Sequence, residues 1–264
     1  MPTKKAAGKP STKARKGPRE GASDVEAVGR ELVAALRARG RAERAEKERA
    51  YLKSDLDHLG VSVPETRATL KELWKTHRLS ADQALTLAEQ LYDLGIYEPR
   101  LAGALWLERV ALTGDQLPRL EALIRRSKTW ALVDPLAVHV LGKLVVAEPA
   151  LNAELDRWIL DDDFWIRRSA MLALLGPLRR GGGDWDRFVR YADDQLDDKE
   201  FFIRKTIGWI LREVARKRPQ LVIGFIAPRT HRASGVTMRE VVKPLDEATR
   251  ERLMAAYREK RACT

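Results

Sequence analysis

Lys199–Arg212 reads KEFFIRKTIGWILR, and part of this segment repeats a pattern that begins 37 residues earlier, in Phe164–Ala170, FWIRRSA. Each copy has an aromatic pair, an isoleucine, two cations, a small hydroxyl residue and an apolar residue, and each follows an acidic stretch. A period of about 40 residues in a helical chain is typical of stacked helix pairs of the HEAT or armadillo kind. The sequence therefore predicts an all-α, HEAT-like solenoid that curves around a concave surface.

The two adjacent cations of each copy occupy equivalent positions of the repeat. They are Arg167 and Arg168 in the first copy, and Arg204 and Lys205 in the second. Because equivalent positions of stacked repeats line up, we expect these cations along one side of the curve. A basic concave surface suits a polyanionic partner, and nucleic acid is the obvious candidate.

The second copy continues into a helix with a mixed face. Phe202, Lys205, Trp209 and Arg212 are three or four residues apart, so they share one face. Two aromatic rings and two cations on one face suit an anion that carries a flat group. The alternative is an ordinary helix in which Trp209 belongs to the core and the cations are solvated.

The charge is unevenly distributed along the chain. The 264 residues carry a formal net charge of +11, and residues 1–22 contain seven Lys or Arg and one acid. We expect residues 1–22 to be a disordered basic tail and residues 23–264 to form a single domain. The tail would either add salt-sensitive attraction to phosphates or serve only solubility.

Several functional classes are excluded by the residues present. Cys263 is the only cysteine, which rules out intrachain disulfides and cysteine-based zinc sites. The four histidines lack metal-ligand spacing, and neither a P-loop nor a nucleophile elbow occurs, so we expect no metal and no cofactor. Since no apolar run reaches about 18 residues, we expect a cytoplasmic protein without membrane contact. A monomer is the simplest oligomeric state.

Helix signals are dense and strand signals are few. Ser80 and Gln83 form a capping box at the start of one helix. We read 221–225 as buried helix rather than a short strand, and a last helix from about 245 to 260. Residues 227–242 contain proline, serine and glycine and are read as a loop.

Trp130 and Asp134 form a second constellation, behind the basic stretch Arg125–Lys128. In a continuous helix they would share a face, where a carboxylate beside an aromatic ring and near cations could serve catalysis. Asp134 also precedes Pro135, and Asp-Pro is a standard helix start with Asp as the N-cap. The residues alone leave both the catalytic role and the capping role of Asp134 open, and capping preferences favour the capping role.

Four segments together resemble the HEAT-like alkylpurine DNA glycosylases, the AlkD-like bacterial DNA alkylation repair enzymes. The resemblance covers about Arg49–Phe225. In family order the segments are AYLKSDLDHLGVSVPETR (50–67), SKTWALVD (127–134), FWIRRSAMLALL (164–175) and KEFFIRKTIGWILREVARKRP (199–219), of which the last is the most specific.

The resemblance implies an array whose concave face holds duplex DNA and an activity that releases N3- and N7-alkylated purines, leaving an abasic site. It also implies roles for six residues: catalysis for Asp134, substrate binding for Trp130, Trp209 and Tyr51, and DNA contacts for Arg168 and Arg212. A bacterial cytoplasmic protein that associates with the nucleoid would follow. This sequence departs from the family pattern at Ala131, where members carry a polar or acidic residue, and at Pro135.

The chemistry agrees with these residues. An N3- or N7-alkylated purine is cationic, so its base leaves neutral and one carboxylate can both stabilise the sugar cation and activate water. Tryptophan faces would hold the cationic nucleotide with about 0.5–2 kcal/mol each. Two alternatives are a non-catalytic HEAT-repeat protein that binds damaged or branched DNA, and a protein-binding scaffold. The combination of Trp130, Asp134 and Trp209 argues against the non-catalytic protein. The repeated cations argue against the protein-binding scaffold.

Overall fold

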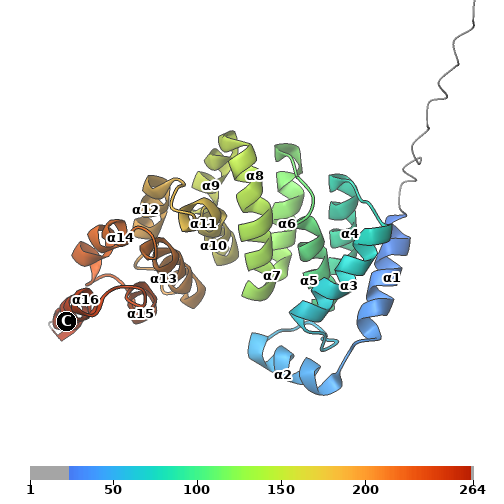
Figure 1. Ribbon diagram of the computed structural model, residues 1–264, viewed down its shortest axis with the longest axis horizontal. Coiled ribbons are helices and arrows are strands. Elements are labelled where there is room, and N and C mark those ends of the chain that lie inside the picture. Colours follow the sequence, from blue (N-terminus) through green and yellow to red (C-terminus); the bar gives the residue numbers. More distant parts are fainter. Residues whose placement is uncertain (1–23, 263–264) are drawn as a thin grey trace, which may run out of the picture.

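Every named element in residues 24–262, the part of the chain that the computed structural model describes, is helical (Figure 1). The first half contains α1 (Val25–Arg37), α2 (Ala42–Leu52), α3 (Val63–Thr76), α4 (Ala81–Asp93), α5 (Tyr97–Leu107), α6 (Leu117–Ser127) and α7 (Trp130–Pro135). The second half contains α8 (Gly142–Ala147), α9 (Asn152–Trp158), α10 (Phe164–Ala173), α11 (Leu175–Arg179), α12 (Trp185–Asp194), α13 (Phe201–Ala215), α14 (Pro219–Ile226), α15 (Gly235–Val241) and α16 (Glu247–Ala262). The predicted all-α fold is confirmed. The tail predicted for residues 1–22 lies outside the described residues.

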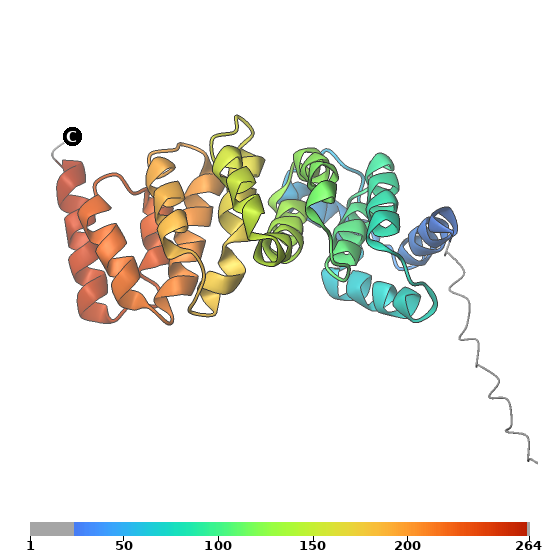
Figure 2. The same cartoon turned by 90° about the horizontal axis from the view of Figure 1, so that it is seen from above.

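The helices are stacked in chain order and form an arc (Figures 1 and 2). In Figure 1, α4, α6, α12 and α14 lie along the outer side, and α5, α7, α13 and α15 lie along the inner side. Helices pack on their sequence neighbours and on helices of the next repeat: α4 packs on α5, α10 on α9 and α13, and α13 on α14 and α15. This is the helical-repeat architecture that the 37-residue pattern predicts.

The repeated motif opens two equivalent helices, α10 and α13. Its isoleucines, Ile166 and Ile203, are both fully buried in the core. The acidic stretch before each copy satisfies backbone donors at the helix start: Asp163 accepts the N–H of Trp165 at 2.9 Å, and Asp198 accepts the N–H of Glu200 at 2.7 Å. The acidic residues thus help to fix where each helix of the motif begins.

Residues 130–147 form one continuous helical rod of α7, a π-helical segment over Leu136–Leu141, and α8. Thr129 precedes the first turn, and Pro135 lies inside the rod with helical φ and ψ of −57° and −45°. The capping interpretation of Asp134 is therefore wrong. Burial of one apolar side holds the rod together across a proline that would otherwise end it.

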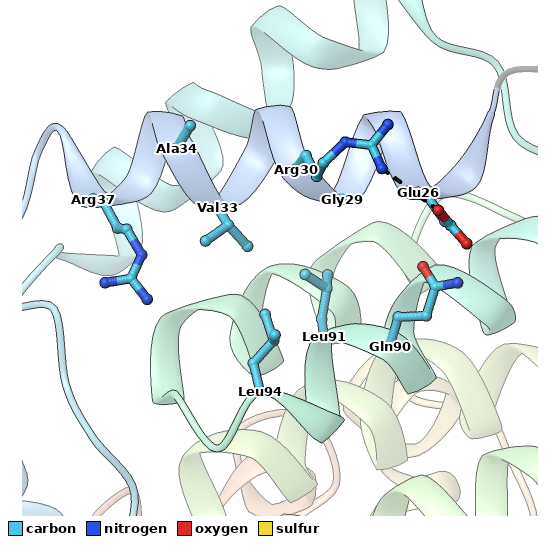
Figure 3. A pocket seen from close by; sticks show the side chains of 9 residues that line it. All are labelled: Glu26, Gly29, Arg30, Val33, Ala34, Arg37, Gln90, Leu91 and Leu94. Carbon is cyan, nitrogen blue, oxygen red and sulfur yellow. Dashed lines mark hydrogen bonds and ion pairs between the residues drawn. The ribbon is translucent and has the colours of Figure 1, made fainter.

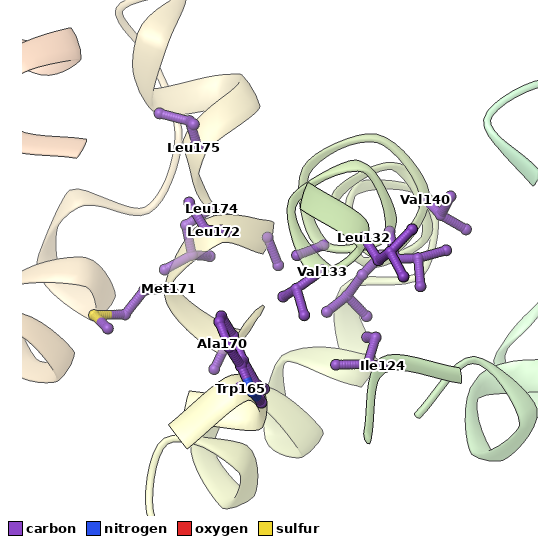
Figure 4. Close-up of a cluster of buried hydrophobic side chains, with 14 of the residues drawn as sticks. Ile124, Leu132, Val133, Val140, Trp165, Ala170, Met171, Leu172, Leu174 and Leu175 are labelled. Carbon is purple, nitrogen blue, oxygen red and sulfur yellow. The ribbon is translucent and has the colours of Figure 1, made fainter. Parts of the chain in front are cut away.

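The rod has the length and hydropathy of a membrane span, over Trp130–Ala147, but 56% of that segment is buried inside the protein. Leu132, Val133 and Val140 belong to a cluster that also contains Trp165 and Met171 from α10 (Figure 4). The rod is accordingly a core helix of the array, packed on its neighbours along one side.

The loop predicted for 227–242 is wrong in its second part, because Gly235–Val241 forms α15. Ser234 is its N-cap and accepts the N–H of Thr237 at 3.1 Å, a start signal hidden among turn-forming residues. α15 packs closely on α13: a Cβ added at Gly208 would lie 2.8 Å from the Cβ of Glu240. The helix predicted for 221–225 is confirmed as α14.

Candidate functional site

A hollow of about 370 Å³ opens between α2, α5, α7 and α13. Four residues that the sequence singled out line it together: Tyr51, Trp130, Asp134 and Trp209. They come from three helices that are far apart in the chain, so the array itself assembles the site. On the rod, Trp130, Ala131, Asp134, Pro135 and Val138 all line the hollow, which is the spacing of one helix face.

Asp134 is one of the carboxylates that line the hollow, together with Glu48 and Glu108. Its carboxylate accepts two parallel bonds from the guanidinium of Arg168: Nε to Oδ1 and Nη2 to Oδ2, each at 2.8 Å. The Asp134 side chain is 16% exposed, which leaves it open to the hollow. Burial raises the pKa of the Asp134 carboxyl, and the charge and hydrogen bonds of Arg168 act in the opposite direction. The pair therefore places an oriented carboxylate in a largely desolvated setting.

Arg168 is an internal residue here. Its side chain is 3% exposed, and its Nη1 donates to the carbonyl of Phe202 at 2.8 Å and to the hydroxyl of Thr206. The ring of Phe202 lies 5.9 Å from the guanidinium. Four of the five N–H donors of Arg168 are used within the protein, so the guanidinium that was predicted to contact DNA orients Asp134 and ties α10 to α13. Arg168 positions the carboxylate.

Three aromatic side chains form the walls of the hollow. Tyr51 is 73% exposed, and its ring meets Trp130 edge to face with centroids 6.3 Å apart. Trp130 and Trp209 are half-buried, so each packs on the core and keeps a surface toward the hollow. Exposed aromatic faces beside a carboxylate suit a cationic ring system.

The predicted cationic face of α13 is present, and its cations bind a carboxylate from α15. Glu240, whose side chain is 5% exposed, binds the Nζ of Lys205 at 2.5 Å, the Nζ of Lys243 at 2.8 Å, and the guanidinium of Arg212. Arg212 also lies near a second carboxylate, that of Glu213, at 3.5 Å, and the three cations still outnumber these two carboxylates. Hydrogen bonds and charge from these cations hold the pKa of Glu240 at about 2, although burial alone would raise it.

Arg167 faces a different set of groups. It donates to the carboxylate of Asp198 at 2.9 Å and to the carbonyls of Asp161 and Asp162. Its side chain is 17% exposed. The two adjacent cations of the first motif copy thus point to different partners, and neither is a free surface charge.

Sequence reasoning missed several residues of the site. Glu240 was missed because its helix was read as a loop. The hollow is also lined by Arg67 and Glu108, whose closest ion-pair distance is 3.0 Å, and by His139 and Arg179. His139 lies four residues after Pro135, and that spacing would have placed the two on one face if the rod had been predicted as continuous.

One group of side chains in the described part of the chain is compact enough to hold a metal ion. The ligand atoms of Glu48, His58 and Glu98 all lie within 4.8 Å of one another. Glu98 already accepts the backbone N–H groups of Leu59, Gly60 and Val61. This cluster joins α2, the following loop and α5 beside the hollow.

A second hollow, of about 460 Å³, lies between α1 and α4 (Figure 3). Val33, Leu91 and Leu94 line it, and Glu26 and Arg30 pair with each other across its rim. It contains none of the residues that the sequence singled out. The chemistry is therefore concentrated in the hollow that holds Asp134.

Fold and site define a helical-repeat protein whose inner face carries an oriented carboxylate, aromatic walls and paired cations. The family model of DNA alkylation repair enzymes matches residues 32–245, and the chain belongs to this family. The resemblance found in the sequence is thereby confirmed. A comparison with curated proteins gave no match.

Solved structures share the fold. A predicted DNA alkylation repair enzyme from Enterococcus faecalis has 23% sequence identity and a TM-score of 0.69, over 79% of this chain and 98% of that one. The smu.31 protein of Streptococcus mutans UA159 has 15% identity and a TM-score of 0.54, over 80% and 100% of the two chains. AlkD2 from Streptococcus mutans has 16% identity and a TM-score of 0.52, over 76% and 99%.

Proposed function

We propose that this protein is a monofunctional DNA glycosylase that hydrolyses the N-glycosidic bond of N3- or N7-alkylated purines in duplex DNA. The observation that carries the proposal is the Asp134 carboxylate, oriented by Arg168 in a hollow with Tyr51, Trp130 and Trp209 as aromatic walls. A carboxylate held in this way is suited to a reaction in which positive charge develops on a sugar.

The proposed reaction needs few groups. The alkylated base already carries a positive charge, so it departs with the bonding electrons as a neutral purine. Asp134 stabilises the cationic sugar and takes a proton from the attacking water. The aromatic faces hold the cationic nucleotide beside the carboxylate.

Lys205 and Arg212 are assigned to the phosphates that flank the damaged nucleotide, with Glu240 setting their positions. DNA would approach along the inner face of the arc, and no metal or cofactor enters the scheme. We further propose that the protein acts as a monomer in the bacterial cytoplasm, on the nucleoid when bound.

One observation favours a second candidate. The bidentate pair of Asp134 with Arg168 would also serve as a purely structural link between α7 and α10. In that case the protein would bind damaged or branched DNA without cutting the glycosidic bond.

The test is release of free base from duplex DNA that contains N7-methylguanine or N3-methyladenine, measured by mass spectrometry. Asp134→Asn keeps the shape of the side chain and a hydrogen-bond acceptor for Arg168, and removes the charge. We expect base release from the native protein, loss of most of that release in Asp134→Asn, and retained DNA binding by both. Equal release by both proteins would exclude the proposed role of Asp134. DNA binding without release by either would establish the non-catalytic candidate.

A further inference from the structure

Pro135 interrupts the hydrogen-bond ladder of the rod beside the reactive carboxylate. A proline has no N–H, so it cannot donate to the carbonyl four residues earlier, which is that of Ala131. The next amide, that of Leu136, donates to the carbonyl of Val133. The proline ring also crowds the carbonyl four residues back and tilts it away from the helix axis. The Ala131 oxygen therefore lacks its regular partner and lies outside the regular ladder.

The Ala131 carbonyl oxygen lies on the exposed side of the rod. A helix carbonyl points along the axis toward the residue four positions later, so the Ala131 oxygen points toward Pro135. Ala131 and Pro135 are both half-buried, and both line the hollow together with Asp134. Leu132 and Val133 lie on the opposite, fully buried side, within the cluster that includes α10 residues (Figure 4).

We propose that the backbone carbonyl of Ala131 is a second acceptor of the active site and that Pro135 keeps it free. The proposal rests on the glycosylase function proposed above. One O–H of the attacking water donates to the Ala131 carbonyl, and the other donates to the carboxylate of Asp134. Two acceptors one helical turn apart fix the direction of the water lone pair, which a single carboxylate cannot do.

The step balances with these groups alone. The C1′–N bond breaks, and its electron pair returns to the alkylated purine, which leaves neutral. The water oxygen forms the new bond to C1′, and one of its protons passes to Asp134. The remaining proton stays on the new sugar hydroxyl, hydrogen-bonded to the Ala131 carbonyl. The partial negative charge of that carbonyl also faces the positive charge that develops on the sugar.

This role accounts for a residue that is unfavourable in its local setting. A proline inside a helix removes a backbone bond and destabilises the rod. The π-helical segment Leu136–Leu141 begins directly after it, and such segments occur frequently at functional sites. Ala131 lines the hollow and contributes only a methyl group, so its own side chain leaves room for a water beside the carbonyl.

The experiment restores the missing donor. Pro135→Ala supplies an N–H that closes the bond to the Ala131 carbonyl. We expect the single-turnover rate of base release to fall about tenfold, the loss expected for one neutral hydrogen bond in the transition state. The enzyme concentration at half-maximal rate, the affinity for duplex DNA and the circular dichroism spectrum stay unchanged. The melting temperature stays the same or rises, because the helix gains a bond.

A second substitution isolates the N–H. Lactic acid introduced at position 135 by nonsense suppression has the side chain of alanine and an ester oxygen in place of the N–H, so it should retain most of the native rate. Pro118→Ala, on the exposed first turn of α6, is the matched control and should leave the rate unchanged.

Three outcomes would overturn the inference. A native rate in Pro135→Ala would mean that the free carbonyl is not used. Equal losses in the alanine and lactic acid proteins would assign the effect to the lost proline ring. Absence of base release from the native protein would remove the proposed function itself, and the inference with it.

Discussion

Arg168 shows how a single residue can decide what its neighbour does. Its guanidinium is almost completely buried and neutralises Asp134 from within the protein. Removing one partner of a buried pair leaves the other charge uncompensated, so Arg168→Met should lower the free energy of unfolding at pH 7 by about 3–5 kcal/mol. Urea unfolding measures this loss. The double variant Arg168→Met/Asp134→Asn should recover part of it, and additive losses would contradict the ion-pair account.

The pH dependence of the reaction follows from the same carboxyl. Asp134 must be ionised to accept a proton, and burial raises its pKa above the ordinary aspartate value of 3.8, against the opposing effect of Arg168. Base release should therefore fall as the pH drops through this raised pKa, with the slope of one proton. Single-turnover rates from neutral to acid pH give the profile. An acid limb at an ordinary aspartate pKa would show that burial does not govern this group.

At the scale of elements, α15 fixes the cationic face of α13 through Glu240. The pKa of Glu240 is about 2 in the folded protein, and the ordinary value is 4.5. Because the pKa of Glu240 is depressed, the ionised carboxylate stabilises the folded protein above pH 4.5, and this stabilisation is lost as the pH falls toward 2. Glu240→Gln should accordingly be less stable than the native protein at pH 7, and the difference should shrink below pH 4.5. Urea unfolding of both proteins at pH 7 and below pH 4.5 measures the difference in stability. A difference that stays the same at both pH values would contradict this account.

The elements also show what can be predicted from sequence. The face of α13 was predictable because Phe202, Lys205, Trp209 and Arg212 follow the helical period along one continuous segment. The helix α15 was not predictable, because its cap Ser234 and its first residue Gly235 are of types that are also common in loops. The continuity of the rod at Pro135 was hidden as well. Local preferences predict a helix start there, and burial by distant helices overrides them.

At the scale of the whole molecule, the repeat predicted the architecture and only part of the site. A 37-residue pattern indicates that helices stack in order, so it predicts which residues face inward. The partners of the inward cations depend on contacts between successive repeats. Arg168, to which the resemblance assigned a DNA contact, binds Asp134, 34 residues away. Pairing across repeats depends on packing geometry, which composition and spacing do not contain.

The inner face of the whole array determines how DNA binding responds to salt. Each cation that neutralises a phosphate releases a counterion, and for duplex DNA this adds about 0.9 to the steepness of log K against log salt concentration. Lys205→Ala should therefore weaken binding at low salt and reduce the slope by about one phosphate contact. Titrations of undamaged duplex by fluorescence anisotropy at several salt concentrations measure the slope. Arg190→Ala, on the outer helix α12 with its side chain 58% exposed, removes the same formal charge away from the inner face and should leave the slope unchanged. Equal changes for the two variants would mean that DNA responds to the net charge of the protein and does not follow the inner face of the arc.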